Sequence, residues 1–278
     1  MHRETRTTLL AALREIYDGR WTRNVGTDGG QTLTWEGRIV AIGACTTAWD
    51  AAHAVISQMG DRFVLMRVNS NVGRIDAGTH AIKNTGQETA MRRELAEVVA
   101  GLIGTVTAQE HSMSKDEEQS ILRAANVAAL ARTAVEVDYR GNVVDSHAPE
   151  MPTRFAKQLT MLMRGALAIG MPRADAFAMI MRCARDSIPQ LRLAVLCDVA
   201  ANPGSRVMAI RRRLQKPRTT VDRTLQSLHC LGLLVCNETE ETRDDKQVQV
   251  WDYSLAEGIN LGDIGVNVAP PPPQPPPL

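Results

Sequence analysis

The stretch KPRTTVDRTLQSLHCLGLL at residues 216–234 decides the fold of the C-terminal part of this chain. Pro217 favours the first turn of a helix, because proline has its φ angle already set and needs no N–H partner there. Gly232 ends the same helix, since glycine accepts the left-handed conformation of a C-terminal cap. Between them, apolar residues recur at the spacing of one buried helical face: Val221, Leu225 and Leu228.

Two more short helices are predicted before this one, and two strands after it. Pro189 favours a helix start, Asn202-Pro203-Gly204 stops that helix, and Ser205 is expected to cap a second. The residues expected to face inward are Leu191, Val195 and Val199 in the first helix and Val207, Ile210 and Leu214 in the second. Residues 233–236 and 247–253 have the composition and alternation of paired strands.

This order of elements, over residues 188–255, resembles the winged helix-turn-helix domains of small bacterial transcriptional regulators. In that family the third helix lies in the major groove of DNA, with the exposed residues near its N-terminus touching base edges. The resemblance implies that the residues with this role are Arg218, Thr219, Thr220, Arg223 and Gln226.

The charges of the region agree with this interpretation. Between residues 202 and 231 the one acid is Asp222, and the further cations expected to meet phosphates are Arg206, Arg211, Arg212, Arg213 and Lys216. A solvated basic face is the alternative. The loop between the two strands is acidic and would repel a phosphate backbone, so we expect no DNA contact from it, which leaves protein docking open: Glu238, Glu240, Glu241, Asp244 and Asp245.

Residues 1–75 indicate a partial α/β region. A helix with Leu9, Leu13 and Ile16 on one face precedes a β-hairpin whose strands are residues 21–25 and 32–35. Two apolar runs rich in β-branched residues, 38–44 and 62–68, predict buried strands. Because residues 49–59 between them read as a helix, the two strands are expected to pair in parallel.

Residues 76–187 are predicted to be helical. Met91, Leu95, Val98 and Leu102 form one stripe that we expect to face a core. A capping box of Ser114 and Glu117 begins another helix near Lys115. Residues 139–144, with a turn at Arg140-Gly141-Asn142, are expected to interrupt that helix. A helix opened by Pro152 and a helix over residues 173–187 are predicted to follow.

These first two regions resemble the second half and the helical lid of an AAA+ P-loop ATPase. The resemblance implies that Thr46 or Thr47, after a strand, would be a polar sensor beside the nucleotide. It makes Arg62 a candidate arginine finger and Arg154, at a helix start, a sensor arginine; surface salt bridging is the alternative for both. Winged helices follow such lids in minichromosome-maintenance helicases and branch-migration motors.

The chain has no GxxxxGK[ST] loop and no apolar strand that ends in paired acids. We therefore expect no ATP hydrolysis by this chain alone and no catalytic residue. Since Met1 falls just before what would be the middle of such a core, the chain is interpreted as a truncated or split ATPase, or as the complement of a separate nucleotide-binding chain.

Composition narrows the class of protein. The formal net charge is +1, so any attraction to nucleic acid must come from local charge. No apolar run is long enough to span a bilayer and no secretory signal is present, which predicts a cytoplasmic protein.

Five scattered cysteines without a CxxC pair predict reduced thiols, and we expect no metal and no cofactor. Residues 256–278 end in a proline run, read as a polyproline II tail that is solvated or a partner ligand.

The sequence as a whole predicts an α+β protein, mostly α-helical, with a short α/β remnant, a helical lid-like middle and a C-terminal winged helix. The expected function is binding of double-stranded DNA, as a transcriptional regulator or as the DNA-contacting part of a mobile-element AAA+ ATPase. The alternatives are an ATPase subunit that supplies Arg62 in trans to a P-loop partner, and a protein-binding adaptor. Self-association is a further possible partnership.

Overall fold

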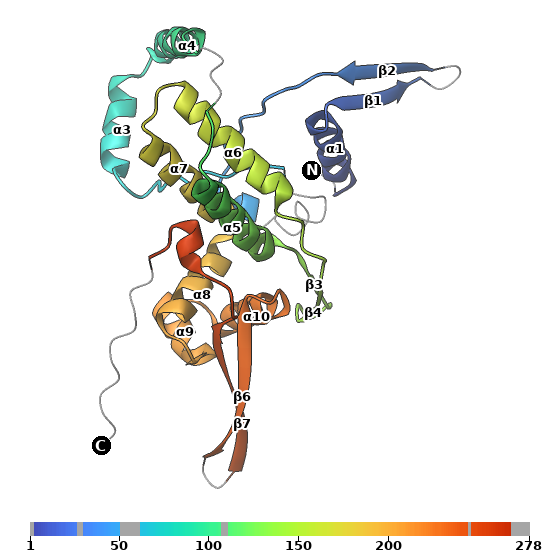
Figure 1. Cartoon of the computed structure of the whole chain (residues 1–278), viewed down its shortest axis with the longest axis vertical. Coiled ribbons are helices and arrows are strands. Elements are labelled where there is room, and N and C mark those ends of the chain that lie inside the picture. The colour runs from blue at the N-terminus through green and yellow to red at the C-terminus, as the bar shows by residue number, and fades with distance from the viewer. Residues whose placement is uncertain (1–2, 27–29, 51–61, 107–110, 244–245, 268–278) are drawn as a thin grey trace.

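The structure is a computed structural model that describes residues 3–26, 30–50, 62–106, 111–243 and 246–267. The chain has the expected α+β, mostly helical class. In Figure 1, helices α5 to α7 lie at the centre, the C-terminal helices and a long hairpin extend below them, and the N-terminal elements lie to two sides. Among the described residues, no helix has both the length and the apolar character needed to cross a membrane.

The N-terminal helix and hairpin form as predicted. Helix α1 (Arg3–Tyr17) is followed by β1 (Arg20–Val25) and β2 (Gln31–Glu36), which pair antiparallel with Trp21 opposite Trp35. The hairpin's turn, residues 27–29, lies outside the described residues. These elements sit apart from the central helices in Figure 1.

The two buried parallel strands predicted at residues 38–44 and 62–68 are wrong. Neither run forms a strand, and Val40 and Ile42 are 88% and 95% exposed. An apolar, β-branched run becomes a strand only where a neighbouring strand offers backbone partners, and none of the described strands pairs with either run. Of the helix predicted between them, residues 48–50 are helical and the rest lies outside the described residues.

Helices α3 (Arg74–Lys83) and α4 (Glu88–Gly104) follow, and the stripe predicted on α4 does not face a core. Helix α4 has no buried residue, and the exposed fractions of its stripe residues lie between 39% and 64%: Met91, Leu95, Val98 and Leu102. The periodicity identified the helix correctly but could not show whether another element covers it.

The central helices are α5 (Lys115–Arg132), α6 (Thr153–Ala168) and α7 (Arg173–Asp186). The capping box at the start of α5 is confirmed, because the Glu117 amide donates to Ser114 Oγ (3.2 Å) and the Ser114 amide donates to Glu117 Oε2 (2.8 Å). Pro152 precedes the first residue of α6, as predicted. Between α5 and α6 lies a small hairpin of β3 (Val135–Val137) and β4 (Val143–Ser146).

The C-terminal unit, residues 190–255, has the elements and the order that the sequence predicts. Its helices are α8 (Gln190–Ala201), α9 (Val207–Leu214) and α10 (Arg218–Cys230), and its strands are β5 (Ser205–Arg206), β6 (Leu234–Arg243) and β7 (Lys246–Leu255). The sheet order is β5-β7-β6, all antiparallel. The long β6–β7 hairpin projects away from the three helices (Figure 1).

One detail of this unit differs from the prediction. Ser205 does not cap α9 but belongs to β5, where it pairs with Tyr253, and its hydroxyl donates to the Asn202 carbonyl at 2.7 Å. Position 206 takes the cap position without a side-chain hydrogen bond. The third strand of the sheet is therefore made from residues whose local sequence signals a helix cap.

A single hydrophobic core joins the central helices to the C-terminal unit. Ile188, at the junction, is fully buried. Arg192 of α8 donates to the carbonyls of Ala131 (2.9 Å) and Thr133 (2.6 Å) at the end of α5, and burial lowers the pKa of Arg192 to about 10. The short helix η1 (Leu261–Ile264) returns the chain onto α5 and α7. Packing is therefore continuous across residue 188.

Candidate nucleic-acid interface

Three exposed cations gather around the turn between α9 and α10. Arg212, Lys216 and Arg218 are all exposed, and none forms an ion pair with a described residue. The turn is tight because Gln215 adopts φ +52°, the left-handed conformation. Pro217 precedes α10 without a side-chain cap, so the first amides of α10 have no partner inside the helix. This end of α10 is consequently positive and offers N–H donors to an anion.

Arg206 is already paired, although the sequence predicts that it meets a phosphate. Its guanidinium forms an ion pair with Glu241 of β6, with Nη1 to Oε2 at 3.1 Å and a second bond from Nη2 to Oε1. Hydrogen bonding to Glu241 raises the pKa of Arg206. The acid predicted to repel DNA thus neutralises one of the cations predicted to bind it. Asp244 and Asp245, the other acids of that loop, lie outside the described residues.

The two further arginines of α9, Arg211 and Arg213, differ in their surroundings. Arg213 forms two hydrogen bonds with the Asp198 carboxylate of α8, at 2.8 and 2.7 Å, and a third with Ser205 Oγ at 2.8 Å. Arg211 is half buried, and its Nε has no hydrogen-bond partner among the described residues. We therefore place Arg213 in the link between α8 and α9 rather than in the interface.

The residues of α10 that the sequence predicts to contact bases differ in how exposed they are and in which partners they bind. Thr219 is exposed, and Gln226 is half exposed and donates from Nε2 to Asp222 Oδ2 at 3.2 Å. Thr220 is half buried. Arg223 is turned aside: its Nη2 donates to the carbonyl of Arg140 in the β3–β4 turn. Arg218 and Thr219 are therefore exposed at the start of α10, and Gln226 lies on the same side of the helix two turns further on.

Of the nucleotide-sensor candidates, Arg62 and Arg154 lie near each other, and Thr46 and Thr47 lie in an exposed segment before residue 50. Thr46 and Thr47 are exposed, and Thr46 Oγ1 accepts a hydrogen bond from the Ala48 amide at 3.3 Å, which caps a helical turn. The Arg62 side chain is 9% exposed, lies 3.2 Å from Asp18 Oδ2 and stacks 5.5 Å from the Tyr17 ring centre. The Arg62 guanidinium is therefore engaged by residues of its own chain.

Arg154 lies close to Arg62, but the two are held by different acids. Arg154 Nη1 is 2.6 Å from Glu150 Oε1. Desolvation, and then the charge of Arg154, lower the pKa of Arg62. Gln158 of α6 donates to the Arg62 carbonyl at 2.7 Å, so this part of the chain is fixed to α6. The surface-salt-bridge alternative describes Arg154 well.

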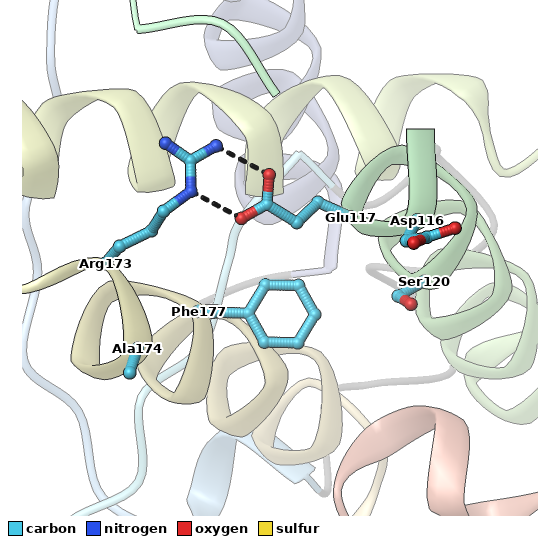
Figure 2. Close-up of a pocket in the computed structure, with 6 residues that line it drawn as sticks. All are labelled: Asp116, Glu117, Ser120, Arg173, Ala174 and Phe177. Atoms are coloured by element: carbon cyan, nitrogen blue, oxygen red, sulfur yellow. Dashed lines mark hydrogen bonds and ion pairs between the residues drawn. The ribbon is translucent and has the colours of Figure 1, made fainter. Parts of the chain in front are cut away.

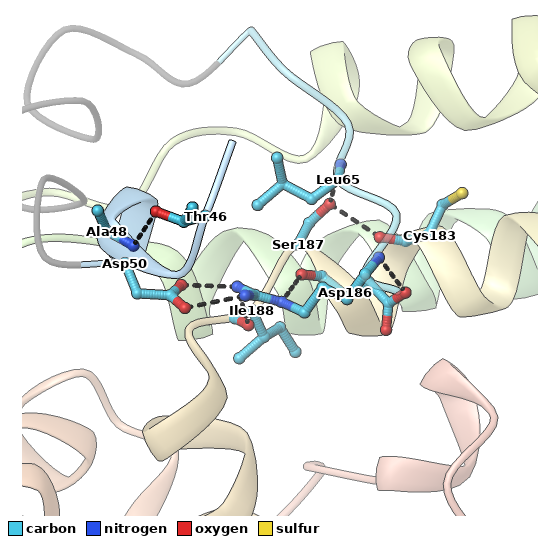
Figure 3. Close-up of polar contacts among 9 residues, drawn as sticks. Thr46, Ala48, Asp50, Leu65, Cys183, Asp186, Ser187 and Ile188 are labelled. Atoms are coloured by element: carbon cyan, nitrogen blue, oxygen red, sulfur yellow. Dashed lines mark hydrogen bonds and ion pairs between the residues drawn. The ribbon is translucent and has the colours of Figure 1, made fainter. Parts of the chain in front are cut away.

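Sequence reasoning missed a polar network that attaches residues 62–68 to the end of α7 (Figure 3). Arg67 forms two bonds with the Asp50 carboxylate (2.6 and 2.9 Å), and its Nε donates to the Asp186 carbonyl at 2.7 Å. Backbone amides add to it, with Leu65 donating to Ser187 Oγ (3.1 Å) and Arg67 to Asp186 Oδ2 (2.8 Å). The partners at the end of α7 are more than a hundred residues away in sequence from residues 65 and 67, so no local pattern could reveal them.

A second ion pair lies beside a cavity of about 410 Å³ between α5 and α7 (Figure 2). Arg173 Nε and Nη2 donate to the two carboxylate oxygens of Glu117, at 2.7 and 2.6 Å. Hydrogen bonding from Arg173 lowers the pKa of Glu117 to about 2. Because these two charges satisfy each other, the pair fastens α5 to α7.

Comparison with protein families, curated proteins and solved structures found no match for this chain. Within the described ranges, no three His, Cys, Asp or Glu side chains gather as a set of metal ligands. The function proposed below is therefore inferred from the geometry of the C-terminal unit.

Proposed function

We propose that this protein binds duplex DNA through the α9–α10 turn and the open face of α10. The observation that carries the proposal is the position of three exposed cations before and at the start of α10, which has no side-chain cap. They are Arg212, Lys216 and Arg218, and they have no acidic partners among the described residues. Two helices and an antiparallel hairpin support that helix, as in DNA-reading helix-turn-helix units. The inferred role is that of a DNA-binding regulator or DNA-contacting subunit without catalysis of its own.

The chemistry of this surface suits a nucleic-acid duplex. Guanidinium and ammonium groups neutralise phosphates, and the free amides at the start of α10 donate to phosphate oxygens. Gln226 carries the donor and acceptor that recognise an adenine edge in the major groove, while Asp222 beside it can accept from cytosine. Phosphate contacts would supply affinity, and these few side chains would supply sequence preference.

The proposal predicts a modest salt dependence, because several cations in this unit are already paired. Three phosphate contacts give a slope of about −2.7 in a plot of log affinity against log salt concentration. The full set of seven basic residues between 202 and 231 would give about −6. The slope therefore distinguishes the interface seen in the structure from the larger one that the sequence suggests.

The first prediction concerns the double variant Arg212→Ala/Arg218→Ala. Removing two phosphate contacts should weaken binding to a fluorescent duplex at least tenfold and reduce the magnitude of the salt slope by about two units. Fluorescence anisotropy between 50 and 200 mM salt measures both quantities.

The matched control is Arg93→Ala/Arg164→Ala, which removes the same charge from two exposed arginines on α4 and α6. It should bind like the wild type. Equal losses in both double variants would mean that general charge, not this surface, attracts DNA. A wild-type protein that retains no duplex at 50 mM salt would overturn the proposal.

A further inference from the structure

The turn that joins β3 to β4, residues 138–142, is held rigidly by one carboxylate. Asp138 accepts hydrogen bonds from the Arg140 amide (2.8 Å), the Asn142 amide (2.8 Å) and Asn142 Nδ2 (3.0 Å). Its own amide donates to the Asn142 carbonyl at 2.9 Å, and Gly141 donates to the Asp138 carbonyl at 2.9 Å. These bonds fix the direction in which the side chains of the turn project.

The same turn docks against the flank of α10. Arg223 of α10 donates from Nη2 to the carbonyl of Arg140. Gly141 has φ +80° and lies against the Arg223 guanidinium, so closely that a Cβ at this position would be 2.8 Å from Arg223 Cζ. Strand β4 contacts α10 along this side (Figure 1), where Thr224 and Ser227 are buried. The open face of α10 stays uncovered, with the turn at its edge.

The outer side of the turn exposes an aromatic ring and a cation. Tyr139 is 88% exposed, and the Arg140 guanidinium lies 5.1 Å from the centre of its ring. Arg140 is exposed and forms no ion pair with a described residue. The Arg140 carbonyl accepts the hydrogen bond from Arg223, and the Arg140 side chain takes no part in that contact. A fixed turn that presents these two groups beside a helix is suited to contact whatever that helix binds.

We propose that Tyr139 and Arg140 form a second contact element for the DNA duplex, on the phosphate backbone that borders the groove occupied by α10. The inference rests on the proposed function and adds to it a part of the chain outside the C-terminal unit. Arg140 pairs with a backbone phosphate, and the Tyr139 hydroxyl donates to a neighbouring phosphate oxygen. Because phosphates carry no base identity, this element raises affinity for every sequence alike.

The double variant Tyr139→Ala/Arg140→Ala tests this second prediction, because alanine at position 140 keeps the carbonyl that Arg223 binds. We expect an affinity loss of about tenfold on both a preferred and an unrelated duplex, and a salt slope smaller in magnitude by about one unit. Circular dichroism and the midpoint of thermal unfolding show whether the variant folds like the wild type. Arg164→Ala is the control for loss of charge.

The possible outcomes separate the two proposals. If the wild type does not bind DNA, the proposed function fails. If the wild type binds and the double variant keeps the same affinity and salt slope, the contact element is wrong and the proposed function stands. Tighter binding by the double variant would also overturn the inference, since it would mean that the turn obstructs the approach of α10. A second variant, Gly141→Ala, should weaken binding by displacing the turn while Tyr139 and Arg140 remain.

Discussion

At the scale of single residues, the arginines of the C-terminal unit look alike in sequence and differ in the structure. Arg212 and Arg218 are exposed, whereas Arg206 pairs with Glu241, 35 positions away, and Arg223 reaches Arg140, 83 positions away. Ion pairing depends on which strands and turns are folded together, and no local pattern contains that information. The sequence therefore indicates a candidate surface but could not determine which cations remain available on it.

The Glu117–Arg173 pair gives the third prediction, which concerns pH. The pKa of Glu117 is lowered to about 2, so the folded state is stabilised above the unfolded value of about 4.5, and this contribution is lost as the pH falls from 4.5 toward 2. Glu117→Gln keeps an oxygen for the Ser114 amide but loses the charge. It should lower the free energy of unfolding by about 0.5–1 kcal/mol at pH 6.

Urea denaturation at a series of pH values measures this difference. The gap between wild type and Glu117→Gln should narrow below pH 4.5 and close below pH 2, where the wild-type carboxylate is also neutral in the folded state. A gap that is constant across the series would show that the loss comes from packing and not from the charge.

At the scale of elements, prediction succeeded where the chain carries its own start and stop signals. Pro189, Pro217 and Gly232 define helices α8 and α10 locally, and Ser114 with Glu117 caps α5. Residues 38–44 and 62–68 carry no such signals, only apolar character, and they became neither strands nor helices. Their conformation depends on distant partners, such as the end of α7 for residues 62–68.

Helix α4 supplies the fourth prediction. Leu95 is 61% exposed, and α4 has no buried residue. Leu95→Gln should therefore change the free energy of unfolding by no more than about 0.5 kcal/mol. Leu159→Ala on α6, where the side chain is fully buried, should cost about 3 kcal/mol. Chemical denaturation compares the two variants. A loss above about 1 kcal/mol for Leu95→Gln would mean that something covers this face in solution.

At the scale of the whole molecule, the C-terminal unit is not an independently packed domain joined to the rest by a linker. The sequence places a boundary at residue 188 because Pro189 starts a new helix there, yet the core runs through that point. Arg192 binds carbonyls at the end of α5, and Asp263 beyond β7 pairs with Arg123 of α5 at 3.0 Å. Continuity of this kind arises from tertiary packing, which the helix signals do not encode.

The fifth prediction follows from this shared core. A fragment of residues 188–267 should unfold without a cooperative transition, or at a markedly lower temperature than the full chain, because it loses part of the shared core and the carbonyls at the end of α5 that Arg192 binds. A fragment of residues 112–267 retains α5 to α7 and should unfold cooperatively. Thermal scans followed by circular dichroism distinguish them. Equal midpoints for the two fragments would show that the C-terminal unit folds on its own.

The acidic β6–β7 hairpin also separates negative from positive charge within the C-terminal unit. Glu238 and Glu240 are exposed on strands that project away from the helices, while Arg212, Lys216 and Arg218 lie at the α9–α10 turn. A chain with a net charge of only +1 therefore carries a permanent electric dipole across this unit. The field of a polyanion would rotate the molecule during approach, bringing the turn forward and the hairpin outward, so that most encounters begin in the correct orientation.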